Sequence, residues 1–141
     1  MSEEKKDCCC STAPKLIFSC SGAADVGELC DHAARALTRE GAGKMYCLAG
    51  VGGGVEPILA NTASAAKLLA LDGCPMDCVK KTLEKAGFEG AAHLRLTDHG
   101  FEKGKSPATE ENLQRVLELA RPLLMAAMIA RPASSMRCPL A

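Results

Sequence analysis

Residues 15–41 read KLIFSCSGAADVGELCDHAARALTREG, and this stretch decides the fold. Its first six residues, 15–20, are a short apolar run of the kind that forms a buried strand. Apolar residues then recur at helical spacing from Val26 to Leu37, which predicts a helix with one buried face. Asp25 stands at the start of that helix, where we expect it to act as a cap. The stretch therefore predicts one strand followed directly by one helix.

The same pattern of a strand followed by a helix recurs twice more along the chain. Each strand is a short apolar run that ends in glycine, and a proline opens the helix that follows. The predicted elements are a strand at 44–50 with a helix from Pro57, and a strand at 66–73 with a helix at 75–86.

A fourth strand, at 92–97, differs because polar residues alternate with apolar ones. His93 and Arg95 are expected to face outward, which predicts that this strand lies at an edge of the sheet. The last clear helix opens at Thr109, and Pro122 is expected to break or kink it.

Strands that alternate with helices predict a parallel sheet with helices on both faces and right-handed crossovers. We therefore expect a three-layer α/β/α domain, Rossmann-like or flavodoxin-like, with a mainly parallel sheet of about four strands. A chain of 141 residues can form one such core. The expected organisation is a disordered, cysteine-rich leader at 1–14, the domain at 15–121, and a tail at 122–141 whose structure the sequence does not define.

Composition disfavours two classes of partner. Lys and Arg number 17 and so do Asp and Glu, while the chain has one Tyr, three Phe and no Trp, so neither a basic field nor stacking surfaces favour nucleic acid. The apolar stretch at 123–130 is far shorter than the roughly 20 residues that cross a membrane. A protein partner cannot be read from the sequence.

Nine cysteines are many for a chain of this size. An odd number does not close into a disulfide framework, and the charged start at 1–7 lacks the apolar segment of a secretory signal. We therefore expect a cytoplasmic protein, in which cysteines serve metal binding or thiol chemistry rather than structural bridges.

Three of the cysteines recur in phase with the strands. The step from Cys20 to Cys47 is 27 residues, and so is the step from Cys47 to Cys74. Because each step is one strand and helix unit, the three thiols are expected to meet at the carboxyl edge of the sheet, where ligands of such folds bind. If Pro75 opens its helix, Cys74 is the N-cap and Cys78 lies one turn further on the same face.

Four thiols at one edge match a structural zinc site, in which four sulfur atoms surround a tetrahedral ion. The expected ligands are Cys20, Cys47, Cys74 and Cys78, with zinc as the metal. A closed shell of four sulfurs leaves no open position for water, so we expect a binding protein more than an enzyme.

The segments that contain the four cysteines also resemble those of the small proteins with a DGC domain, which are described as zinc-binding. The resemblance covers about residues 15–118 and rests on CSGAADVGELCDHAARAL, KMYCLAGVGGG, LDGCPMDCVKKTLEKAG and LTDHGFEKGKSPATEEN. It implies the same four cysteines as ligands. The segment at 7–10 and everything after Pro122 have no counterpart in that family.

Two other uses of the thiols stay open. In a redox enzyme or sensor, Cys74 would attack and Cys78 would resolve, although the pair lacks the spacing of the CxxC motif. In an iron–sulfur carrier, the four thiolates would hold a cluster. His99 is an alternative ligand or general base, because it follows the fourth strand at the same edge.

Other cysteines are given simpler roles. Cys30 lies on the apolar face of the first helix and is expected to be part of the core. Cys8, Cys9 and Cys10 fall in the leader, where adjacent thiols are open to oxidation and to metal exchange.

Overall fold

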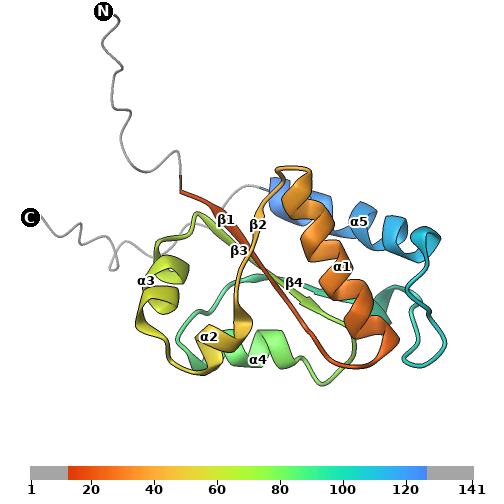
Figure 1. The fold of residues 1–141 in the computed structure, drawn as a ribbon, viewed down its shortest axis with the longest axis horizontal. Helices are drawn as coiled ribbons and strands as arrows, with labels where there is room; N and C mark the ends of the chain where they lie inside the picture. Colours follow the sequence, from red (N-terminus) through yellow and green to blue (C-terminus); the bar gives the residue numbers. More distant parts are fainter. Residues whose placement is uncertain (1–12, 127–141) are drawn as a thin grey trace, which may run out of the picture.

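Four parallel strands form the sheet in the computed structural model, which describes residues 13–126 (Figure 1). Their spatial order is β2, β1, β3, β4, so the predicted parallel sheet and the edge position of the fourth strand are confirmed. The strands are β1 (Lys15–Ser19), β2 (Lys44–Met45), β3 (Lys67–Asp72) and β4 (Ala92–Arg95).

Helices cover both faces of this sheet, which confirms the three-layer α/β/α fold. They are α1 (Asp25–Arg39), α2 (Leu48–Gly52), α3 (Glu56–Ser64), α4 (Cys78–Lys85) and α5 (Glu110–Met125), with a short 3-10 helix, η1 (Leu96–His99). The helices α1 and α5 pack together on one face, and α4 and α2 lie on the other (Figure 1).

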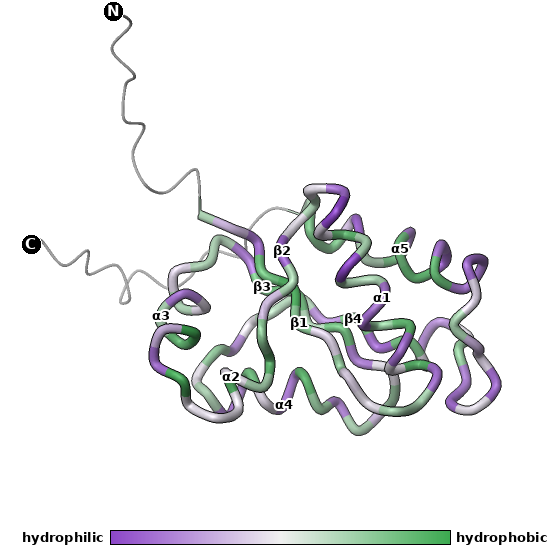
Figure 2. The backbone as a smooth tube through the Cα atoms, in the orientation of Figure 1, coloured by the Kyte–Doolittle hydropathy of each residue, from purple (hydrophilic) through white to green (hydrophobic). Residues whose placement is uncertain are grey.

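The two central strands are buried on both sides. In β1, Ile17 faces α1 and α5, whereas Leu16 and Phe18 face α4. Strands buried on both faces are apolar without a break, and the green tube at the centre of Figure 2 follows them. This explains why short apolar runs identified β1 and β3 in the sequence.

Several predicted boundaries differ from those in the structure. The second strand ends at Met45 rather than at residue 50, because the chain turns into α2. Of the two effects expected of Pro122, a break or a kink, the break does not occur, because the last helix continues to Met125 with the proline inside it. A proline removes one backbone hydrogen bond, and the buried side chain of Leu124 holds the last turn against the core in spite of that loss.

The part of the chain described by the structure holds no helix long and apolar enough to cross a membrane.

Asp25 is not the N-cap that the sequence predicted, and its side chain has a different role. Ala24 is the N-cap of α1, and Asp25 is the first helical residue. Its Oδ1 atom accepts hydrogen bonds from the amides of Val26 and Gly104, each at 2.8 Å, and its Oδ2 atom accepts one from Ser106 at 2.9 Å. The Asp25 carboxylate thus ties the loop before α5 to the start of α1.

We expect Asp25→Ala to lower the melting temperature at neutral pH, with a smaller difference from the wild type in acid. Hydrogen bonds from the Gly104 amide first, and then from Ser106 and Val26, lower the pKa of Asp25. The stabilisation is therefore present above the unfolded pKa of about 3.9 and is lost as the pH falls through the lower folded value. Melting curves against pH measure this, with the exposed Glu28→Ala as control. A difference that grows in acid would contradict the assignment.

Candidate functional site

Two of the predicted ligands lie beside the central strands at their carboxyl ends. The amide of Cys20 donates to the carbonyl of Leu71 at 3.0 Å, which continues the pairing of β1 with β3 and places Cys20 next to Asp72. Cys74 follows the end of β3 by two residues. Both side chains are half-buried, so they line the edge rather than the core.

The other two predicted ligands are exposed and stand at helix starts. Cys47 is the N-cap of α2, and its sulfur accepts a hydrogen bond from the Gly50 amide at 3.3 Å. Cys47 falls within the strand predicted at 44–50, but β2 ends at Met45, so Cys47 lies beyond the strand and is exposed. Cys78 is the first residue of α4.

Cys30 is buried with no exposed surface, which confirms its predicted place in the core. Burial raises the pKa of its thiol, and charges on Cys20, Asp72 and Cys74 act in the same direction. The five cysteines within residues 13–126 are free thiols, whereas Cys8, Cys9, Cys10 and Cys138 lie outside that range.

The structure does not bring the four sulfur atoms into a single cluster. Within residues 13–126, the one group of three or more His, Cys, Asp or Glu side chains whose ligand atoms all lie within 4.8 Å of one another consists of Asp72, Asp77 and His93. His99, the predicted alternative ligand, does not belong to this group. That histidine is exposed, and its carbonyl accepts a hydrogen bond from Arg115 at 3.5 Å.

The predicted start of α4 is wrong. Neither Cys74 nor Pro75 begins the helix, because residues 74–77 form a turn in which the Asp77 amide donates to the Cys74 carbonyl at 3.2 Å. Asp77 is the N-cap and has a left-handed backbone, with φ of 53°. Cys74 is therefore in a loop, and the helix dipole acts on Cys78 rather than on Cys74.

Asp72 fixes the position of α4. Its side chain is 1% exposed. The Oδ1 atom accepts from the Val79 amide at 2.8 Å, and the Oδ2 atom accepts from the Lys80 amide at 3.1 Å. A carboxylate at the end of β3 thus satisfies two free amides in the first turn of α4, as a capping side chain does. Asp72 is thus the last residue of β3 and also positions the helix that carries Cys78.

His93 does not face outward, contrary to the prediction for an edge strand. Its Nε2 atom lies 2.9 Å from Oδ2 of Asp72 and 3.6 Å from Oδ1 of Asp77. Asp77 is held in turn by the Arg95 guanidinium through both oxygens, and Arg95 also pairs with Asp98 at 3.2 Å. The hydrogen bond from Arg95 lowers the pKa of Asp77.

These contacts identify the group of Asp72, Asp77 and His93 as a support for the edge rather than as a cation site. Both oxygens of each aspartate already accept hydrogen bonds, and Arg95 already supplies a positive charge. The alternation of His93 and Arg95 in the sequence showed that they share a face. Only the register, with Arg95 opposite Asp72, shows that this face meets α4.

Gly73 is required by close packing. A Cβ atom there would lie 2.8 Å from Cγ2 of Val26 and 2.9 Å from its backbone carbon, which is too close for real atoms. The turn after β3 therefore passes directly over the start of α1. In the sequence Asp-Gly-Cys, the aspartate caps α4, the glycine allows this approach, and the cysteine follows at the edge.

We expect Gly73→Ala to lower the free energy of unfolding by about 2 kcal/mol, because the backbone must move away from Val26. The matched control is Gly52→Ala, where the new Cβ would meet its nearest atom at an ordinary 3.5 Å. Denaturant unfolding of the metal-free proteins compares the two. Equal stability of the two variants would contradict the packing argument.

The fold and the site together define the class of protein. It is a small three-layer α/β domain with free thiols along the carboxyl edge of its sheet. The family model of the DGC domain matches residues 16–120, and the chain belongs to that family. It is similar to the Anaerobic and virulence modulator AnvM of Pseudomonas aeruginosa, with 36% identity over 108 residues that cover 75% of this chain and 82% of the relative. No solved structure matches the chain significantly.

Proposed function

We propose that this protein binds one zinc ion through Cys20, Cys47, Cys74 and Cys78, and that the ion has a structural role. The observation that carries the proposal is the common position of the four thiols, which follow three adjacent parallel strands at the same edge. Each is at least partly exposed, in contrast to Cys30. Four thiolates are a donor set that zinc prefers.

The proposed ion would join the segments that follow β1, β2 and β3. Strand pairing fixes where these segments begin, and Asp72 fixes the start of α4 beside Cys78. Coordination also requires the sulfur atoms to come closer together than they are in this structure. We therefore expect zinc binding to order the edge as well as to stabilise the fold.

A closed shell of four sulfurs supplies no water to a substrate, so the proposed role is binding rather than catalysis. The name of the relative in Pseudomonas aeruginosa, a modulator, is compatible with a regulatory protein. Free thiols favour a reducing compartment, and we propose the cytoplasm.

Metal content tests the proposal. The protein would be purified anaerobically without chelator, with Cys8, Cys9 and Cys10 replaced by Ser so that they cannot bind metal. We expect about one zinc per chain by elemental analysis, as a single four-sulfur site requires. Single Cys→Ser variants at residues 20, 47, 74 and 78 should each lose it. Cys30→Ala is the matched control, since it removes a thiol from the same domain without touching the edge.

Two alternatives would give different results. A thiol redox protein would contain no metal and would form a bridge between Cys74 and Cys78 on mild oxidation. An iron–sulfur carrier would be brown and would contain iron and sulfide. Zinc that survives in all four single variants would also overturn the four-cysteine site.

A further inference from the structure

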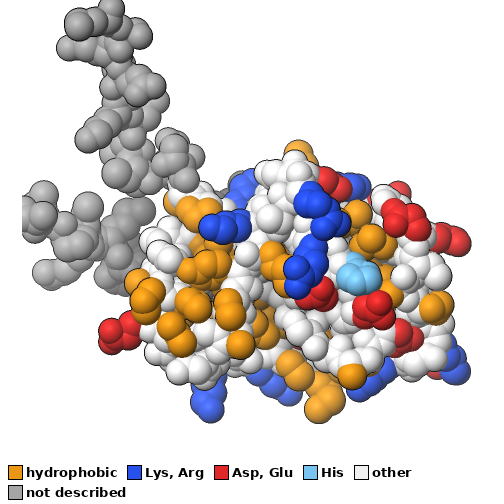
Figure 3. All heavy atoms as spheres, viewed as in Figure 1, with side chains coloured by type: hydrophobic (Ala, Val, Ile, Leu, Met, Phe, Trp, Pro, Cys, Tyr) orange, Lys and Arg blue, Asp and Glu red, His pale blue; other side chains and the backbone are white. Residues whose placement is uncertain are grey.

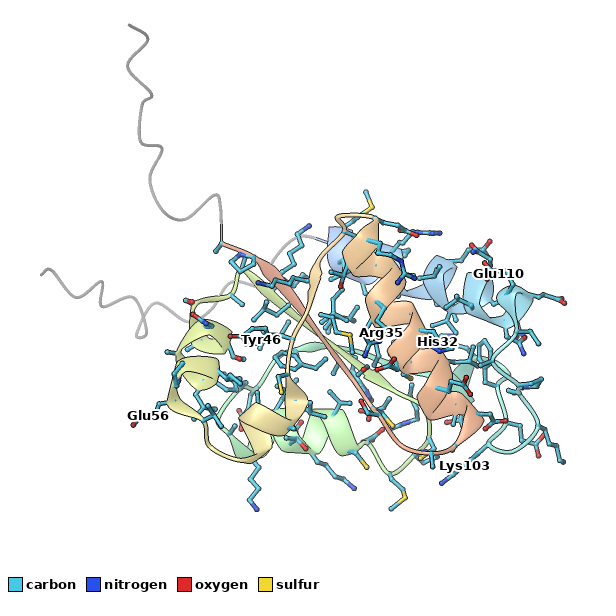
Figure 4. All side chains as sticks on the ribbon, in the orientation of Figure 1. His32, Arg35, Tyr46, Glu56, Lys103 and Glu110 are labelled. Atoms are coloured by element: carbon cyan, nitrogen blue, oxygen red, sulfur yellow. The ribbon has the colours of Figure 1, made fainter. Side chains whose placement is uncertain are left out.

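A pocket of about 470 Å³ opens beside Cys47, at the edge of the sheet nearest to β2. Its walls come from β1, α1, α2 and α4, from Met45 at the end of β2 and from the residues between β2 and α2. Figure 4 shows Arg35 on the side of α1 toward β2, and Tyr46 between β2 and α3. Met45, Leu48 and Ala49 contribute an apolar wall, and the other lining side chains are mostly polar. A pocket with one apolar wall and several polar groups is typical of a small-molecule site.

Ser19, which lines this pocket, has an unsatisfied hydroxyl. The residue is 2% exposed, and its Oγ atom has no hydrogen-bond partner among residues 13–126. A buried hydroxyl without a partner costs free energy, so it is satisfied from outside the chain, by a water or by a polar group of a ligand in the pocket.

An ion pair on α1 forms the outer wall of the pocket. The Nε atom of Arg35 donates to Oδ2 of Asp31 at 2.7 Å. Within the described part of the chain, the two Nη atoms of Arg35 and the Oδ1 atom of Asp31 have no hydrogen-bond partner. Figure 3 shows basic and acidic side chains together over α1, next to the apolar side chains over α2 and α3. The pair thus offers donors for an anion and an acceptor for a cation side by side.

We propose that this pocket binds a small zwitterion with the head group of an α-amino acid. The ligand's carboxylate would accept from the free Nη atoms of Arg35, a geometry that suits a planar guanidinium. Its ammonium group would donate to Oδ1 of Asp31, and a polar group of the ligand would meet Ser19. The apolar wall would take a short side chain. This binding does not require the proposed zinc ion.

A binding experiment would use free proteinogenic amino acids as probes. Cysteine and histidine are left out because they chelate metals. Saturation-transfer NMR on the full chain would find the amino acid that binds, and amide shifts of Ser19, Met45 and Thr82 would place it in the pocket. The N-acetyl form lacks the ammonium and the carboxamide form lacks the carboxylate, so each should bind about tenfold more weakly or worse.

Three variants of the pocket test the assignment further. Asp31→Asn and Arg35→Gln should each weaken binding by about tenfold, while Arg39→Gln, an exposed basic residue on the same helix but outside the pocket, should not. Ser19→Ala should weaken binding and also raise the melting temperature, because it removes a buried hydroxyl without a partner. A hydroxyl that only holds a water would give the rise in melting temperature without the loss of binding.

Carrying out the titrations on zinc-treated and on chelator-treated protein separates the two proposals. Binding in both states supports the pocket, whatever the outcome for zinc. The inference would be overturned if no amino acid shifts the Ser19, Met45 and Thr82 amides, or if the N-acetyl and carboxamide forms bind as well as the parent. Unchanged affinity in Arg35→Gln would overturn it as well.

Discussion

Asp72→Ala is expected to lower the free energy of unfolding by roughly 3 kcal/mol, from the loss of a buried, charged helix cap together with its histidine partner. The substitution leaves the amides of Val79 and Lys80 without their acceptor and removes the hydrogen bond between Asp72 and His93. Because Asp72 is almost wholly buried, water cannot easily replace these contacts. Denaturant unfolding of metal-free protein measures the effect on the fold alone.

The matched control for this result is Asp98→Ala. Asp98 is an acidic residue at the same edge that pairs with Arg95, but its side chain is 55% exposed. Exposed ion pairs contribute little to stability, so this variant should resemble the wild type. Equal unfolding midpoints for Asp72→Ala and Asp98→Ala would show that Asp72 does not hold α4 in place.

Removal of zinc is expected to have the second large effect. A ligand that binds only the folded state, at a free concentration about 1,000 times its dissociation constant, stabilises that state by about 4 kcal/mol. A chelator should therefore lower the melting temperature of the wild type substantially, and added zinc should restore it. The same chelator should leave the Cys20→Ser and Cys78→Ser variants unchanged, since they are expected to lack the ion already.

Cys30→Ala provides the control for zinc removal. Its thiol is part of the core, so the substitution should lower stability by a constant amount while the response to chelator stays the same. A response to chelator that disappears in Cys30→Ala, or persists in Cys20→Ser, would contradict the assignment of ligands.

The strands and layers of this fold could be predicted because buried positions are occupied by apolar residues, whose spacing along the sequence differs between strands and helices. The strands β1 and β3 are apolar on both faces, and the spacing from Val26 to Leu37 identified α1. The in-phase cysteines followed from the same repeat, and their place at the carboxyl edge required only that the strands be parallel.

Contacts between residues far apart in the chain could not be predicted in the same way. The start of α4 depends on Asp72, whose carboxylate reaches forward to Val79 and Lys80. The inward orientation of His93 depends on the register of β4 against β3. The preference of proline for the first helical position predicted that α4 starts at Pro75. The buried carboxylate of Asp72 and the turn before Asp77 place the start at Cys78 instead.

X-ray absorption at the zinc edge tests the central claim most directly. Measured on zinc-loaded protein without Cys8, Cys9 and Cys10, the spectrum should show a first shell of four sulfur atoms at about 2.3 Å. A first shell that contains nitrogen or oxygen at about 2.0–2.2 Å would contradict the four-cysteine site.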